Sequence, residues 1–111
     1  MQMTMTDQSG VTVLAVAGSM DAATVAEFDE RWKEALAAGV QKMVVDLSGI
    51  EYISSAGLRG ILLLAKTAMA KKVSLAFSGM TGMAEDIFKL SGFFTILKTF
   101  PDSASAVAAL A

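Results

Sequence analysis

Two adjacent serines, Ser54 and Ser55, are the side chains of this sequence whose type and position best support chemistry. They stand directly before a helical pattern that runs from Ala56 to Lys71. A serine at such a position accepts a hydrogen bond from a backbone N–H that has no partner in the first helical turn. The same free N–H groups and the positive end of the helix dipole favour an anion or a phosphorylated serine. The pair therefore predicts either a simple helix cap or a site that tolerates a phosphate.

Composition argues against most other chemistry. The chain has no histidine and no cysteine, so it lacks the commonest general base and the thiolate ligands of metal sites. The run Ser55-Ala56-Gly57 matches only the latter half of the nucleophile elbow G-x-S-x-G, because Ile53 occupies the first glycine position. The carboxylates of Glu27, Asp29 and Glu30 are interpreted as a solvated helix face. We therefore predict no enzyme activity, no metal site and no cofactor.

Size and charge set further bounds. The 111 residues predict one domain, 1–111, and a hydrophobic content of 54% supports a well-filled core. The net charge is −2 and the longest basic run is Lys71-Lys72, so nucleic acid is not an expected partner. No stretch approaches the ~20 apolar residues of a membrane span, and we expect no membrane insertion and no signal peptide. The absence of cysteine fits a reducing compartment, and we expect a cytoplasmic location.

Hydrophobic patterning predicts the elements that position the serines. Strands are expected at Met1–Thr6, Val11–Ala17, Gln41–Asp46, Val73–Phe77 and Thr95–Lys98. Turns are expected at Asp7–Gly10, Gly18–Asp21, Leu47–Gly49 and Ser78–Thr81. Helices are expected at Ala22–Ala38, with Asp21 as its cap, at Ala56–Ala70, from Thr81 to Ser91-Gly92, and after Pro101-Asp102-Ser103.

The order ββαβαβαβα predicts an α/β fold. Its sheet should be mixed and mostly parallel, with about five strands, an antiparallel N-terminal edge hairpin and about four helices. The first helix should turn Val25, Phe28, Trp32, Ala35 and Leu36 inward. The second should turn Leu58, Ile61, Leu62, Ala65 and Met69 inward, with Leu63 and Leu64 widening that face, so that it is largely buried.

The stretch from Asp46 to Arg59 reads D-L-S-G-I-E-Y-I-S-S-A-G-L-R. It resembles the signature of the STAS domain, the fold of anti-sigma factor antagonists, which is roughly D-L-S-x-[VIL]-x-[FY]-[IM]-D-S-[ST]-G-[LI]. Further blocks that are similar to the family follow the same order along the chain: Val16–Asp21, Ile87–Phe93, and Phe100–Asp102 with Val107–Leu110. The resemblance covers nearly the whole chain.

The resemblance implies a non-enzymatic protein switch. Its unphosphorylated form would bind an anti-sigma factor, often a serine protein kinase of the histidine-kinase-like ATPase class. Phosphorylation of a serine at the start of the second helix would end the binding, and a metal-dependent phosphatase of the PP2C type would reverse it. We expect the free chain to be a monomer.

The sequence departs from the family pattern at its centre. Ser54 stands where the family has Asp, Ser55 stands where it has the first Ser, and Ala56 stands at the usual phosphoacceptor position. We predict Ser55 as the acceptor and Ser54 as the second choice, whereas Ser48 is interpreted as a turn residue. The expected partner-binding residues are Asp21, Ser54, Ser55, Ala56, Gly57, Leu58 and Arg59.

Two alternatives stay open at this point. Asp21 and Arg59 are equally well explained as a helix cap and a solvated side chain. Ala56 and the missing Asp also favour a constitutive STAS interaction subunit of a signalling or lipid-transport complex, without phosphoregulation.

Overall fold

The computed structural model describes residues 1–80, 85–86 and 98–111. They form a five-stranded sheet whose strands lie in sequence order. The strands are β1 (Gln2–Gln8), β2 (Val11–Met20), β3 (Lys42–Ile53), β4 (Ser74–Ser78) and β5 (Thr99–Phe100). β1 and β2 pair antiparallel, and each later pair is parallel. The predicted mixed sheet with an antiparallel edge hairpin is confirmed.

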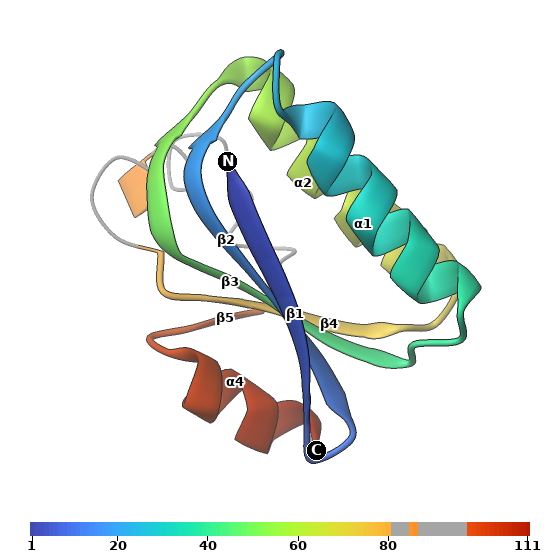
Figure 1. Cartoon of the computed structure of the whole chain (residues 1–111). Coiled ribbons are helices and arrows are strands. Elements are labelled where there is room, and N and C mark those ends of the chain that lie inside the picture. The colour runs from blue at the N-terminus through green and yellow to red at the C-terminus, as the bar shows by residue number, and fades with distance from the viewer. Residues whose placement is uncertain (81–84, 87–97) are drawn as a thin grey trace.

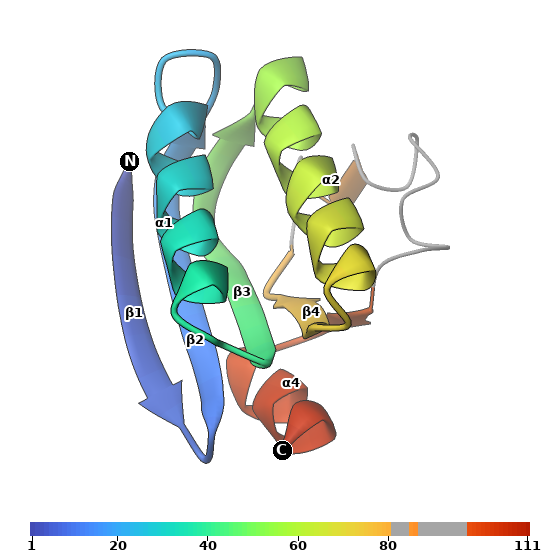
Figure 2. The same ribbon diagram turned by 90° about the vertical axis from the view of Figure 1, so that its right-hand side faces the viewer.

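Helices cover both faces of this sheet. α1 (Val25–Ala37) and α2 (Ser55–Ala70) lie side by side on one face, and α4 (Ser103–Leu110) lies on the other (Figures 1 and 2). The helix predicted after Thr81 and the motif Ile87–Phe93 fall outside the described residues, apart from residues 85–86. Among the helices of the described part, none is long and apolar enough to span a bilayer.

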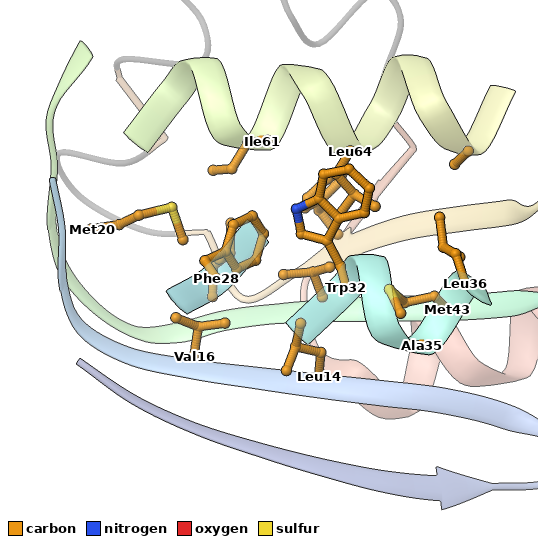
Figure 3. Close-up of a cluster of buried hydrophobic side chains, with 14 of the residues drawn as sticks. Leu14, Val16, Met20, Phe28, Trp32, Ala35, Leu36, Met43, Ile61 and Leu64 are labelled. Atoms are coloured by element: carbon orange, nitrogen blue, oxygen red, sulfur yellow. The ribbon is translucent and has the colours of Figure 1, made fainter. Parts of the chain in front are cut away.

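The larger core fills the space between the sheet and the α1–α2 pair. Figure 3 shows Phe28 and Trp32 of α1 pointing toward α2, above Leu14 and Val16 of β2. Trp32 is 1% exposed, and its ring N–H donates to Asp29 Oδ1 at 3.1 Å. Burying one such large apolar side chain contributes roughly 1.5–3 kcal/mol. The prediction that Trp32 is a core residue is confirmed.

The buried stripe of α2 differs from the predicted one. Met69, predicted to point inward, is 70% exposed, and Leu63 is 42% exposed. Ile61 and Leu64 are buried as predicted, and Leu58 and Ala65 pack half-buried against the larger core, whereas the other buried residues, Gly57, Gly60 and Ala68, were not predicted. Because α2 is apolar on several sides, the periodicity alone did not select the stripe. The buried stripe is set by Gly57 and Gly60, which approach β2 and α1 closely.

The hairpin loop is shorter than predicted. β1 continues to Gln8, and only Ser9 and Gly10 form the turn, with φ values of 55° and 80°. Two successive residues with positive φ make a two-residue loop of type I′, which matches the twist of the flanking strands. The register of β1 on β2 is therefore set by this loop.

β2 and β3 both extend beyond their predicted ends at Ala17 and Asp46. The predicted turn at Leu47–Gly49 is wrong, because these residues lie within β3. Between the pairs Ala15–Asp46 and Ala17–Gly49, β3 has one residue more than β2, and the same happens again between Gly18 and Ser19. The turn-forming residues thus make β-bulges, which increase the local bend of the strands instead of ending them.

Other boundaries shift by a few residues. Ala22–Thr24 form a turn, so α1 begins at Val25, and β4 begins one residue later than predicted. The strand predicted at Thr95–Lys98 lies mostly outside the described residues, and Lys98 itself precedes β5. The final helix is confirmed, with Asp102 at its N-cap accepting from the Ser105 N–H at 2.7 Å.

Asp102 makes the stability of the α4 end depend on acid pH. Its hydrogen bonds with the Ser105 backbone and side chain lower the pKa of its carboxyl below the ordinary value. The stabilisation is therefore present above the pKa of the unfolded chain and is lost as the pH falls through the folded pKa. We expect Asp102→Asn, which keeps the cap, to remove this acid dependence from thermal unfolding measured between about pH 6 and pH 2. An unchanged pH profile in this variant would contradict the assignment.

Candidate functional site

The carboxyl ends of β2 and β3 meet at the start of α2. The last pair of the two strands joins Met20 to Ile53, and both side chains are buried. Figure 1 shows β2 and β3 curving together toward the first turns of α1 and α2. The backbone N–H of Ser54 donates to the Met20 carbonyl at 2.9 Å. This bond ties the start of α2 to the end of β2.

Ser54 is the N-cap of α2, which is one of the two roles that the sequence predicted for the serine pair. Its backbone is extended, with φ −86° and ψ 176°, and its Oγ accepts from the Gly57 N–H at 3.3 Å. The side chain is half-buried. Its hydroxyl therefore serves the first turn of the helix and is only partly available to another molecule.

Ser55 differs from Ser54 in exposure and bonding. It is the first helical residue and is exposed, and its hydroxyl makes no hydrogen bond within the described residues. Arg59 lies one helical turn further along and is also exposed. α2 carries no acidic residue in its first turn. A phosphate on Ser55 would thus be the first negative charge placed there, at the positive end of the helix dipole.

Gly57 lets α2 approach β2 closely. A Cβ at this position would lie 2.5 Å from the Met20 carbonyl oxygen and 3.1 Å from Cγ2 of Ile53. Gly60 plays the same role against α1, because its Cβ would lie 2.6 Å from Cγ2 of Val25. Both glycines are buried, so they position the site through packing.

The remaining predicted site residues lie around this first turn. Ala56 is half-buried, and Leu58 is half-buried with its side chain against the larger core. Asp21 follows Met20 directly and therefore lies at the same end of the sheet, as expected. The prediction that it caps α1 is wrong, because Thr24 occupies the N-cap.

Asp21 holds the turn before α1. Its Oδ1 accepts from the N–H groups of Ala23 and Thr24 at 2.9 Å and 3.2 Å, and from the Thr24 hydroxyl at 3.2 Å. The Thr24 hydroxyl also donates to the Ser19 carbonyl at 2.8 Å. This network leads the chain from β2 into α1 and holds the Met20 carbonyl beside Ser54.

Two residues of the site were missed by the sequence analysis. Met20 supplies the carbonyl that accepts from the Ser54 N–H and so fixes the start of α2. Gly57, a glycine in the first turn of an apolar helix, was the sequence signal for such a close approach of two backbones. Tyr52, two residues before the cap, is 45% exposed. An exposed aromatic side chain three residues before Ser55 adds apolar surface that another protein could contact.

These features define a small α/β domain in which a largely buried helix begins at an exposed serine. The STAS domain family model matches residues 2–106, and the chain belongs to this family. This confirms the resemblance drawn from the sequence motifs.

Named relatives and a solved structure agree with this membership. The anti-sigma factor antagonist BtrV of Bordetella bronchiseptica is 31% identical over 111 residues, which are 100% of this chain and 93% of BtrV. The anti-sigma-F factor antagonist RsfB of Mycobacterium tuberculosis is 29% identical, covering 94% of this chain and 87% of RsfB. A crystal structure of an anti-sigma factor antagonist from Mycobacterium paratuberculosis superposes with a TM-score of 0.90 at 21% identity, covering 98% and 92% of the two chains.

The two glycines of α2 provide a test of how the site is positioned. An added methyl group in a helix normally stabilises it, since alanine has the higher helix propensity. We expect Gly57→Ala to lower the free energy of unfolding by roughly 2 kcal/mol instead, because its Cβ meets a backbone carbonyl that has no room to move. Chemical denaturation measures the change.

Gly60→Ala is the matched control. Its Cβ meets the end of the half-buried Val25 side chain, which is able to shift more easily than backbone. A smaller loss than in Gly57→Ala is expected. If both variants lost the same stability, or if Gly57→Ala were as stable as the wild type, the close contact with Met20 would not be the constraint.

Proposed function

We propose that this chain is an anti-sigma factor antagonist that binds an anti-sigma factor through the start of α2. Membership of the STAS family and the names of its two relatives support the class of partner. The exposed surface around Ser55, Arg59 and Tyr52 supports the position of the contact. The domain acts by binding and carries out no reaction of its own.

Ser55 is the phosphoacceptor in this proposal. The observation that carries it is the contrast between the two serines: Ser55 is exposed with an uncommitted hydroxyl, while Ser54 uses its hydroxyl to cap α2. A kinase must reach the hydroxyl and bring its oxygen into line with a phosphoryl group. Ser55 meets this requirement without loss of the helix cap.

The switch works through charge and needs no refolding. A phosphate adds about −1.5 to −2 charges, and the helix N-terminus stabilises them, so the fold accepts the modification. A partner surface shaped for a neutral hydroxyl would have to desolvate the same charges. A tenfold to hundredfold loss of affinity requires only about 1.4–2.8 kcal/mol.

Two enzymes complete the proposed cycle. The anti-sigma factor is itself a serine protein kinase of the histidine-kinase-like ATPase class, and a PP2C-type phosphatase removes the phosphate. The cycle takes place in the cytoplasm. Asp21 keeps the β2–α1 turn in place beside the contact surface, and Arg59, one turn from Ser55, is positioned to contact either the partner or the phosphate.

A constitutive STAS interaction subunit is the second candidate. It is favoured by Ala56, which stands at the usual acceptor position, and by the absence of Asp at position 54. The two candidates differ in one measurable respect. Incubation with the captured partner, Mg²⁺ and ATP adds one phosphoryl group to the switch protein and adds none to the constitutive subunit.

The switch predicts different behaviour for two Ser55 variants in partner capture from the native cell. We expect Ser55→Ala to capture an ATPase-fold partner as the wild type does and Ser55→Asp to capture at least tenfold less of it. Neither variant should change the thermal unfolding temperature strongly. Quantitative mass spectrometry of the captured proteins measures the effect, and intact mass after incubation with ATP shows whether Ser55→Ala still accepts phosphate.

Ser103→Asp is the matched control, since Ser103 is the first residue of α4 on the opposite face of the sheet. It should bind as the wild type does. Equal recovery with Ser55→Ala, Ser55→Asp and wild type would exclude a switch at Ser55. Phosphate incorporation in Ser55→Ala that disappears in a Ser54→Ala variant would move the acceptor to Ser54.

A further inference from the structure

β1 is the outer strand of the sheet, and its free edge runs over seven residues. Within the described part of the chain, β1 pairs only with β2 (Figure 2). Such an edge presents a row of backbone N–H and C=O groups that have no strand partner. These backbone groups are therefore available to pair with a further strand.

The hairpin loop determines which residues face outward. In a two-residue hairpin, the residues that flank the loop exchange hydrogen bonds, here Gln8 and Val11. Every second residue of β1 back from Gln8 therefore turns its backbone groups toward β2. Met3, Met5 and Asp7 turn theirs toward the free edge.

This edge lacks the features that normally prevent strand pairing. It has no lysine, no proline and no bulge, and its pairing with β2 runs without a break from Gln2 to Gln8. Its single charge is Asp7, next to the loop. Met5 is 36% exposed on the edge strand. An edge of this length with unbroken pairing to its neighbour and a single charge is a pairing site.

The side chains of β1 are complementary to those of a second β1 in antiparallel orientation. We propose that a second copy of this chain pairs along this edge, with the two-fold axis at Thr4. In that register Met3 faces Met5 of the second copy, Gln2 faces its Thr6, and the two Thr4 residues face each other. Asp7 faces Met1, so no charge opposes a like charge.

The same register is favourable for the backbone and for the apolar face. The outward-facing residues Met3 and Met5 form the hydrogen-bonded pairs, as antiparallel geometry requires. They lie on the face of the larger core, because their partners in β2 are Val16 and Leu14. The Met3–Met5 pairs of the two copies would extend that core across the junction and cover the exposed part of Met5.

The pairing leaves the proposed switch surface accessible. Figure 2 places α1 between β1 and α2, so the edge and the start of α2 lie on different sides of the domain. The inference does not rest on the proposed function. A dimer of this kind joins two complete sheets into one of ten strands and presents two α2 starts, whereas the sequence alone suggested a monomer. Its small contact area predicts a weak, concentration-dependent association.

Single introduced cysteines test the register, because the chain has none of its own. At the two-fold axis the two Thr4 Cα atoms would be about 4.5 Å apart, within the span of a disulfide. The two Thr6 residues would be about 13 Å apart, four strand positions from each other, which no disulfide bridges. Both side chains are exposed on the same strand face, so Thr6→Cys is the matched control.

We expect the purified Thr4→Cys chain under mild oxidation to give covalent dimers whose fraction rises with protein concentration. Thr6→Cys should give at least tenfold less at the same concentration, as read on non-reducing gels. No covalent dimer from Thr4→Cys, or equal amounts from both variants, would overturn the proposal.

A proline at position 5 tests the same edge without any cross-link. Met5→Pro removes one outward N–H and none of the hydrogen bonds to β2, and proline is tolerated on edge strands. We expect sedimentation equilibrium to show at least tenfold weaker self-association for Met5→Pro than for Met5→Val, which alters the same side chain but keeps the outward N–H. Circular dichroism verifies that both variants remain folded. Self-association of folded Met5→Pro equal to that of wild type would overturn the proposal.

Discussion

The hydrogen bond from the Ser54 N–H to the Met20 carbonyl is the contact on which the candidate site depends. It requires β2 to extend to Met20 and β3 to extend to Ile53, which the two bulges in β3 make possible. It also requires Gly57, because any side chain there would push the first turn of α2 off the same carbonyl. The strand end, the cap and the glycine therefore form one unit, and the turn held by Asp21 keeps its carbonyl in place.

This unit divides two tasks between two neighbouring serines. Ser54 completes the helix and is held by it, whereas Ser55 stands at the exposed surface of a helix that is otherwise deeply packed. A helix buried along Ile61 and Leu64 has a fixed direction, so its positive end stays at the surface beside Ser55. In the proposed switch, a partner would read a charge on Ser55 without any change in the domain. The core on the other face, built on α4, has no part in this site.

The departure from the family motif acquires a physical meaning in this arrangement. The family motif that the sequence resembles has Asp where this chain has Ser54, and either residue is a good N-cap because both offer an oxygen to the first-turn N–H groups. Replacing Asp by Ser thus preserves the cap and removes one negative charge from the first turn. In the proposed switch, a phosphate on Ser55 would therefore meet no carboxylate at position 54.

The sequence by itself determined the order of the elements that the structure describes, the parallel arrangement of the later strands, the core role of Trp32 and the serine cap of α2. Each of these follows from local patterning, from capping chemistry or from a motif within one short stretch. Only the tertiary structure decided that Leu47–Gly49 continues β3, that Met69 points outward, and that the Ser54 N–H is bonded to the Met20 carbonyl. Residues that favour turns are equally suited to bulges, and a helix apolar on several sides has no unique inward stripe. In both cases the outcome is set by contacts between segments far apart in the chain, which no local pattern contains.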